Sequence, residues 1–288
     1  MQKVILYYNF VPVPDPETTR LWQKELCTSL GLKGRIIIAD HGINGTLSGS
    51  MKDIKAYVKA MRLHPLFKNT QYKWSDGTGD EFPKLSVKVR PELITLAPDE
   101  KFDVYNSTKG LTPKQWHEYI EKNPDVIILD ARNDYESDIG VFRGDNLVAT
   151  EIKVFKQIKE TLKDLPKDKP ILTYCTGDVR CEYLSAYMKH KGFDEVYHLD
   201  GGIVKYGQQF KDDGYWEGKC FVFDQRMSLE FSEDSKDISQ CLYCKNLTSH
   251  YVNCANNQCN KLILICSKCS KAHKTCSAKK CEKVISIA

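Results

Sequence analysis

The sequence predicts a multidomain protein that combines α+β and α/β architecture, and three observations support this prediction. Residues 1–95 alternate short apolar strand segments with segments of helical periodicity. Residues 123–218 alternate continuous apolar runs, typical of buried parallel strands, with helices. Residues 219–288 form a C-terminal extension with eight cysteines in closely spaced pairs. Residues 96–122 are expected to form a linker and a short helix.

The N-terminal region is predicted to follow the order βαββαβ, which is that of a ferredoxin-like domain. The expected elements are a strand at 4–11, a helix at 16–30, strands at 34–39 and 44–49, a helix at 51–62 and a strand at 85–94. A domain of this order has one open sheet face, and such faces often bind RNA. The fold by itself does not establish that function.

The central region is predicted to contain a parallel sheet with right-handed crossover helices. The expected elements are a helix near 116–119, a strand at 126–132, a polar loop at 133–144, a helix at 152–162, a strand at 171–174, an amphipathic helix at 183–193, and a strand and helix within 196–210. Sites in such sheets form at the carboxyl ends of strands. Asp130, Cys175 and Asp200 each lie at such an end.

The most informative segment is ILTYCTGDVRCE, from Ile171 to Glu182, which places Cys175 between a strand and a helix. Free amides at the start of the helix and its dipole favour an anion there. Arg180 adds a positive charge, so we expect a thiolate at neutral pH. The alternative is a buried structural cysteine. Such a cysteine would not need Gly177 and Arg180 around it.

Composition constrains the function only broadly. Hydrophobic residues make up 41% of the 288 residues and charged residues 28%, as in globular proteins with packed cores. The net charge of +4 gives no argument for a nucleic-acid partner. From Cys241 onward, however, there are eight lysines and one acidic residue, Glu282. This basic tail could contact phosphates, or it could simply be a solvated surface.

The chain shows no targeting segment and no apolar run of membrane-spanning length, so we expect a cytoplasmic protein without a membrane partner. In a reducing compartment, the twelve cysteines indicate metal ligands or catalytic thiols, not disulfides.

The spacing of the eight cysteines in the extension predicts two structural Zn²⁺ sites, each with four thiolate ligands. The expected ligands are Cys241, Cys244, Cys254, Cys259, Cys266, Cys269, Cys276 and Cys281. An interleaved pairing is favoured, in which the first and third pairs share one ion and the second and fourth share the other. LILIC is expected to be a strand that returns the chain past the first pair. A sequential pairing is nearly as plausible.

Several segments together resemble one family, the rhodanese-domain tRNA uridine hydroxylases (TrhO). They are GRIIIADHGINGTLSG, FPKLSVKVRPE, LDARNDYESDIGVFRG, YCTGDVRCE, HLDGGIVKYG, FVFDQRM and the paired-cysteine tail. The resemblance implies a central rhodanese-like domain and oxygen-dependent 5-hydroxylation of uridine at wobble position 34, in the tRNA anticodon loop. Molecular oxygen would be the co-substrate. The sequence carries no flavin or nicotinamide fingerprint.

The resemblance also implies roles for individual residues. Cys175 would be the essential thiol, and the six-residue loop from Cys175 to Arg180 is of the length that cradles a persulfide in rhodaneses. Arg180 would stabilise the sulfur anion. Cys181 would either resolve an oxidised Cys175 or pack at the helix start. Asp130 would hold the loop through hydrogen bonds.

Substrate-binding residues are less specifically indicated. Arg132 and Glu136 could face the substrate or pair with one another, and Tyr135 and Tyr206 are candidates for stacking on an unpaired base. A plausible route has the Cys175 thiolate adding to carbon 6 of uracil, which makes carbon 5 electron-rich. Alternatively, a persulfide or peroxy species of Cys175 acts as the oxidant.

Asp178 departs from the family pattern, which has glycine at this position. A carboxylate beside a thiolate raises the thiol pKa, so we expect the change Asp178→Gly to increase the thiolate fraction. Two other functions therefore stay open. One is a persulfide sulfurtransferase, and the other is a non-catalytic RNA-binding protein with a decayed loop.

Overall fold

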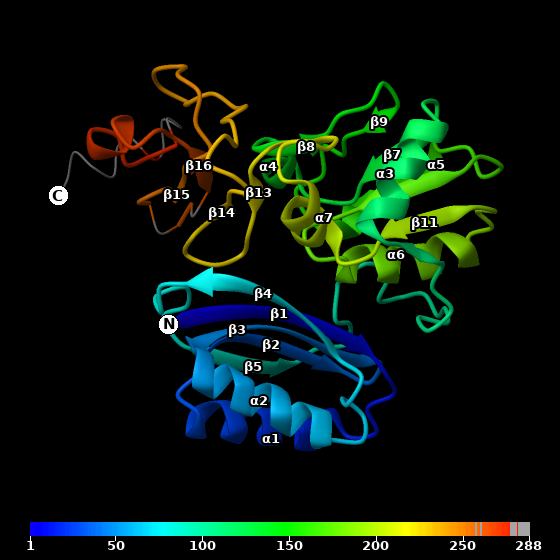
Figure 1. The fold of residues 1–288 in the computed structure, drawn as a ribbon, viewed down its shortest axis with the longest axis vertical. Coiled ribbons are helices and arrows are strands. Elements are labelled where there is room, and N and C mark those ends of the chain that lie inside the picture. Colours follow the sequence, from blue (N-terminus) through cyan, green and yellow to red (C-terminus); the bar gives the residue numbers. More distant parts are fainter. Residues whose placement is uncertain (257, 260, 277–280, 282–288) are drawn as a thin grey trace.

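The computed structural model describes residues 1–256, 258–259, 261–276 and 281, and shows an N-terminal domain, a central domain and a C-terminal extension (Figure 1). Part of the basic tail lies outside the described residues, namely Lys279, Lys280, Glu282 and Lys283. The mixed architecture confirms the predicted fold class. Within the described ranges, no helix has the length and apolar character needed to span a membrane.

The N-terminal domain is a five-stranded sheet covered on one face by two helices. Its elements are β1 (Gln2–Phe10), α1 (Pro16–Ser29), β2 (Lys33–Ala39), β3 (Gly42–Ser50), α2 (Met51–Leu63), β4 (Gln71–Gly77) and β5 (Leu85–Val89). The strand order is β4-β1-β3-β2-β5. The first four strands give the βαββαβ order of a ferredoxin-like fold.

One expected strand has a different place in this sheet. The segment at 85–94 was expected to be the last strand of the βαββαβ unit, but β5 is an added edge strand that pairs in parallel with β2. The true last strand is β4, which pairs antiparallel with β1. Its sequence, QYKWSDG, is largely polar and only partly buried, so it lacks the hydrophobic pattern that marks a strand.

Local sequence fixes where the two helices begin. The Asp15 side chain accepts a hydrogen bond from the Thr18 amide at 2.9 Å, and the Ser50 hydroxyl accepts one from the Asp53 amide at 3.2 Å. Such caps satisfy amides that have no partner within the helix. Both helices pack on the same side of the sheet, and the opposite face turns toward the central domain and the extension (Figure 1). That face is therefore available to contact the cysteine loop.

The central domain has a parallel five-stranded sheet in the order β6-β11-β10-β7-β9, with a separate two-stranded ladder of β12 and β8. Its elements are β6 (Gly110–Leu111), α3 (Pro113–Lys122), β7 (Ile127–Asp130), α4 (Asp134–Ser137), β8 (Gly140–Phe142), β9 (Leu147–Val148), a 3-10 turn (Phe155–Gln157), α5 (Ile158–Lys163), β10 (Ile171–Tyr174), α6 (Val179–His190), β11 (Val196–Leu199), α7 (Gly202–Phe210) and β12 (Trp216–Gly218). Because β10 is the middle strand, Cys175 lies at the centre of the sheet's carboxyl edge.

Three details of the central domain differ from the sequence-based expectation. The expected polar loop at 133–144 contains α4 and β8, and the expected helix at 152–162 begins only at Phe155 as a 3-10 turn. Helix α6 starts at Val179, and nearly all of its residues are buried, so it is not amphipathic. The segment that joins the N-terminal and central domains covers its outer side: Tyr183 donates to the Glu92 carboxylate, just before the linker, at 2.9 Å, and Tyr187 to the Glu100 carboxylate, within it, at 3.0 Å.

The C-terminal extension contains short strands and two clusters of cysteines. Its elements are β13 (Cys220–Phe221), β14 (Ser228–Leu229), β15 (Tyr251–Asn253), β16 (Leu262–Leu264) and a 3-10 turn (Cys269–Lys271). Strand β16 confirms the strand expected in LILIC and pairs antiparallel with β15. The extension contacts both other domains: the Tyr251 hydroxyl donates to the Tyr135 carbonyl at 2.8 Å, and Arg226 donates to the Ser75 hydroxyl at 3.0 Å.

Candidate active site

The Cys175 sulfur lies between the end of β10 and the start of α6, and its residue is only 1% exposed. The Asp178 amide donates a hydrogen bond to Cys175 Sγ across 3.2 Å. Asp178 has a φ of 82°, in the left-handed region that favours glycine. In this conformation the Asp178 amide faces the sulfur, and an amide so placed stabilises a negative charge there.

The surroundings of Cys175 favour its thiolate. Burial acts to raise the pKa of this thiol, but a hydrogen bond from the Cys181 thiol and the positive charge of Arg180 outweigh it and lower the pKa to about 6. The nearby Asp178 carboxylate opposes this shift without reversing it. Burial and the hydrogen bond to Cys175 raise the pKa of Cys181, so Cys181 stays protonated and acts as the donor. Cys175 therefore carries the negative charge of this pair.

Arg180 is fixed by a buried carboxylate. Its two terminal nitrogens donate to the two oxygens of Glu136 at 2.6 and 2.7 Å, and both side chains are less than a tenth exposed. This bidentate geometry sets the plane of the guanidinium group. The ring of Phe223, from the extension, lies 5.5 Å from the guanidinium carbon. Glu136 therefore faces Arg180, and it neither faces the cleft nor pairs its carboxylate with Arg132.

Asp130 and Arg132 form a second buried ion pair beneath the loop. Arg132 Nη2 donates to Asp130 Oδ2 at 2.6 Å, and neither side chain is exposed. The Tyr174 hydroxyl donates to the same carboxylate at 2.7 Å. Asp130 thereby ties the end of β10 to the segment after β7. It lies in position to hold the loop, and Arg132 belongs to that support.

The structure does not favour two of the expected substrate contacts. Arg132 and Tyr206 are fully buried, so neither can touch a substrate in this conformation. The Tyr206 hydroxyl accepts a hydrogen bond from the Tyr215 amide at 3.0 Å and contacts His117 Nδ1 at 2.8 Å. Tyr135 is partly buried against Phe221 beneath the extension. Sequence periodicity alone could not show that these polar side chains are buried in the interior of the protein.

Four residues that the sequence analysis did not single out as site residues surround Asp178. His198 Nδ1 contacts Asp178 Oδ1 at 2.7 Å, and the Tyr8 hydroxyl lies 2.8 Å from Asp178 Oδ2 and 2.7 Å from Glu182 Oε2. Lys73 donates to the Gly177 carbonyl at 2.8 Å. His198 could have been found, because it lies near the carboxyl end of a parallel strand. Tyr8 and Lys73 gave no sequence signal, since they come from another domain.

These residues line a cleft between the N-terminal and central domains, with a volume of about 880 Å³. Side chains of β1 and β4 form one wall, including Tyr8, Lys73 and Gln71. The other wall comes from the central domain and includes Asp178, His198 and Lys205. A cleft with aromatic, cationic and amide groups can bind a planar polar ligand with an anionic backbone.

The extension covers the other side of the cysteine loop. The Thr176 hydroxyl donates to the Phe221 carbonyl at 3.3 Å, and Phe223 lies on Arg180. Arg226, whose guanidinium is held by Asp224 at 2.6 Å, also donates to the Asp76 carbonyl at 2.9 Å. The segment FVFDQRM thus joins the loop to the N-terminal domain. The loop is enclosed by all three parts of the chain.

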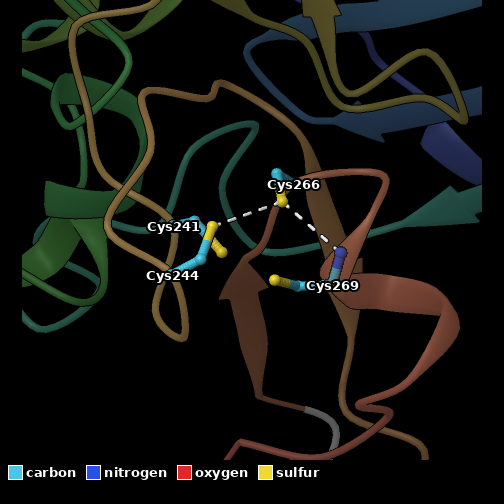
Figure 2. A group of neighbouring side chains, drawn as sticks. All are labelled: Cys241, Cys244, Cys266 and Cys269. Carbon is cyan, nitrogen blue, oxygen red and sulfur yellow. Dashed lines mark hydrogen bonds between the residues drawn. The ribbon is translucent and has the colours of Figure 1, made fainter.

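Eight of the nine cysteines of the extension, all except Cys220, gather into two groups. One consists of Cys241, Cys244, Cys266 and Cys269, and the other of Cys254, Cys259, Cys276 and Cys281. In each group the sulfur atoms all lie within 4.8 Å of one another. Figure 2 shows the first group, whose side chains converge from two separate turns. This is the interleaved grouping, and each group offers four sulfur ligands, so both can bind metal ions.

The fold and the loop together define the class of protein. The middle strand of a parallel α/β sheet leads into a six-residue loop, Cys175 to Arg180, which begins with a cysteine of lowered pKa, and a buried helix continues from it. This arrangement defines a rhodanese-like domain with a thiol site. Full-length similarity identifies the family more narrowly: the chain belongs to the tRNA uridine(34) hydroxylase family.

The comparisons agree along the whole chain. A domain family described as "UPF0176 acylphosphatase like domain" matches residues 2–93, "Rhodanese-like domain" matches 112–209, and "Rhodanase C-terminal" matches 217–282. The tRNA uridine(34) hydroxylase of Corynebacterium kroppenstedtii is 44% identical and covers 98% of each chain. That of Corynebacterium glutamicum is 47% identical, covering 93% of this chain and 88% of the relative.

Among solved structures, a rhodanese-like domain from Anabaena sp. has 21% identity and a TM-score of 0.32. It covers 38% of this chain and 80% of that domain.

Proposed function

We propose that this protein is a cytoplasmic enzyme that hydroxylates uridine 34 of tRNA at carbon 5, with Cys175 as the catalytic thiol. The observation that carries the proposal is the Cys175 thiolate in its loop, in a chain 44% identical over its full length to a tRNA uridine(34) hydroxylase. A cradle of this kind stabilises a nucleophilic sulfur. Arg180 holds positive charge beside it, Cys181 donates to it, and Asp130 positions the loop.

The substrate would be the single-stranded anticodon loop, bound in the cleft between the N-terminal and central domains. Unpaired bases can be splayed out and stacked on aromatic rings, and Tyr8 offers such a ring at the cleft. Lys205 lies at the cleft wall and can face the phosphate backbone. Since Cys175 is 1% exposed, we expect the uracil to reach the sulfur when the domain interface opens.

The proposed reaction begins with addition of the Cys175 thiolate to carbon 6 of uracil, which makes carbon 5 electron-rich. One atom of O₂ then enters the C5–H bond as hydroxyl, and Cys175 leaves carbon 6. The second oxygen atom leaves as water, which requires two electrons and two protons. We assign the two electrons to the Cys175 thiolate and the Cys181 thiol, which form one S–S bond; the Cys181 S–H supplies one proton and solvent water supplies the other. An external thiol would restore the pair.

In the C-terminal extension we propose one Zn²⁺ ion in each cysteine group. Four thiolates in tetrahedral reach are the ligand set of structural zinc. All four ligands would come from the protein, which leaves no position for substrate. The extension has a small core, in which Ile263 and Ile265 are the buried aliphatic residues among those described. Metal binding would therefore supply much of its folding free energy.

The test is nucleoside mass spectrometry of tRNA from a strain that lacks the gene, with and without a complementing copy. We expect loss of 5-hydroxyuridine and its derivatives, restored by the wild-type gene but not by Cys175→Ser. A six-residue loop is also suited to persulfide transfer. Unchanged 5-hydroxyuridine with depleted thiouridine would overturn the hydroxylase proposal in favour of a sulfurtransferase.

A further inference from the structure

Both ring nitrogens of His198 face hydrogen-bond acceptors. Nδ1 lies 2.7 Å from the Asp178 carboxylate, and Nε2 lies 3.2 Å from the Thr108 carbonyl. A neutral imidazole has only one N–H group, so satisfying both acceptors requires the imidazolium ion. His198 is 5% exposed, and the ion pair with Asp178 is therefore well shielded from water. Although burial acts to lower the pKa of His198, Asp178 raises it to about 9.

The Asp178 carboxylate is held on both of its oxygens. Oδ1 faces His198, while Oδ2 accepts from the Gly201 amide at 3.2 Å and contacts the Tyr8 hydroxyl at 2.8 Å. A single side chain thus connects β11, the turn before α7 and the N-terminal domain. Its own backbone, at a φ of 82°, carries the amide that donates to Cys175 Sγ. The position of that amide depends on how the side chain is held.

Other charged groups complete the surroundings of Asp178. Tyr8 has one hydroxyl hydrogen but contacts carboxylates of both Asp178 and Glu182, so one of the three groups must carry a further proton. Burial raises the pKa of Glu182, whereas His198 and Lys73 outweigh burial and lower the pKa of Asp178, so Glu182 is the carboxyl of the two that takes up a proton more readily. Lys73 lies over the Tyr8 ring, 4.7 Å from its centroid, and adds positive charge from β4.

We propose that His198 and Asp178 are a positioning pair for the Cys175 thiolate. A glycine would adopt the left-handed backbone conformation of residue 178 without strain. Here the contacts of the Asp178 carboxylate hold the residue in that conformation, and the positive charge of His198 offsets the negative charge of the carboxylate. Tyr8 extends the anchor across the domain interface. The charge of Asp178 is thus balanced within the site, and the presence of Asp178 does not indicate a loop that has lost its function. The inference rests on the proposed reactive thiolate at Cys175, but not on the hydroxylation reaction.

The test measures the pH dependence of Cys175 alkylation by iodoacetamide in the full-length protein, quantified on the peptide that contains Cys175. We expect His198→Gln to raise the apparent pKa of Cys175 by about one pH unit or more, because it leaves a buried carboxylate uncompensated beside the sulfur. His190→Gln is the matched control, since His190 is an exposed histidine at the end of α6, the helix that follows the cysteine loop. It should leave the profile unchanged.

A double-mutant cycle separates this role from general destabilisation. In an Asp178→Gly background, His198→Gln should produce no further shift of the Cys175 pKa, because its effect passes through Asp178. A shift of equal size in both backgrounds would overturn the proposal, and so would an unchanged pKa in His198→Gln alone. If His198→Gln does not fold, Tyr8→Phe replaces it, with a smaller rise expected and an unchanged pKa contradicting the proposal.

The two proposals can fail separately. A shifted thiol pKa in His198→Gln, together with wild-type protein that forms no 5-hydroxyuridine, would retain the positioning pair and reject the hydroxylase. The reverse combination would reject only the positioning pair.

Discussion

Arg180 and Glu136 form a planar, two-bond ion pair inside the protein, with nitrogen–oxygen distances of 2.6 and 2.7 Å. The arginine thus supplies positive charge to the Cys175 site without being free to move toward a substrate. Glu136 lies in α4, which sequence analysis had placed in a polar loop. The carboxylate that orients the arginine is therefore supplied by a single helical turn after β7.

We expect Glu136→Gln to destabilise the protein by about 3–5 kcal/mol, because it removes one partner of a buried ion pair and leaves Arg180 uncompensated. Urea unfolding followed by circular dichroism measures the change. Glu160→Gln is the matched control: Glu160 pairs with Lys163 on the surface, and its loss should cost at most about 1 kcal/mol. Equal effects of the two substitutions would contradict the structural role of Glu136.

We expect Cys175→Ser to abolish 5-hydroxyuridine formation in the complementation assay while leaving the fold intact. Serine has similar size, but its hydroxyl stays protonated at neutral pH, so the anion is lost. Cys27→Ser is the control, because Cys27 is a fully buried thiol in the N-terminal core, away from the loop. Retained activity in Cys175→Ser, with an inactive Cys181→Ser, would transfer the catalytic role to Cys181.

The sequence predicted the parts of the site that are local in the chain. Cys175, its six-residue loop and Arg180 lie in one strand-loop-helix segment, where spacing alone indicates a cradle for an anion. Tyr8 contacts Asp178 from 170 positions away, and Lys73 reaches Gly177 from another sheet. No periodicity within either segment encodes such a contact.

The same limit applies to two residues that the sequence suggested as substrate contacts and that are buried in this structure. Arg132 and Tyr206 have polar groups that commonly mark a surface, but here a buried carboxylate and a backbone amide satisfy them. Strand β4 was missed because most of its residues are polar; Tyr72 and Trp74 pack against the N-terminal core, and backbone pairing with β1 adds to that packing. Short regular spacings, such as those of the cysteine pairs, predict which residues come together in the fold. Contacts that depend on packing between domains cannot be predicted from such local patterns.

We expect the contribution of His198 to the free energy of unfolding to be lost at alkaline pH. Its pKa in the folded protein, about 9, lies above the ordinary value of 6.5. The contribution is therefore complete below about pH 6.5 and is lost as the pH rises through about 9. Thermal unfolding from pH 6 to 10 should show a fall in midpoint over this window for the wild type. In His198→Gln the fall should be smaller, and an identical fall would remove His198 as its source.

We expect Asp178→Gly to lower the apparent pKa of Cys175, in the direction that sequence analysis gave. The structure makes the expected change small, because His198 already compensates the carboxylate and would lose its charge together with its partner. Glycine also keeps the left-handed backbone available. The alkylation profile of Cys175 measures the shift. A rise in the pKa would show that anchoring of the loop amide by the Asp178 side chain outweighs the loss of charge.

We expect purified protein never exposed to chelator to hold about two Zn²⁺ ions per chain, measured by elemental analysis. Chelation should unfold the extension and leave the N-terminal and central domains folded, because their cores contain none of the eight cysteines. Cys220→Ser is the control for a buried thiol outside both groups, and it should keep both ions. Less than one zinc per chain in the wild type would contradict the two-ion proposal.

Paired double substitutions then distinguish the interleaved from the sequential arrangement. Cys244 and Cys266 belong to the same group in the structure, so Cys244→Ser/Cys266→Ser should lose one ion and keep the other. Cys244→Ser/Cys259→Ser removes one ligand from each group and should lose both ions. A sequential arrangement would give the opposite pair of results, since Cys244 would then share an ion with Cys259. Each variant removes two thiols from the same module, so a difference in metal content between them reports the grouping itself.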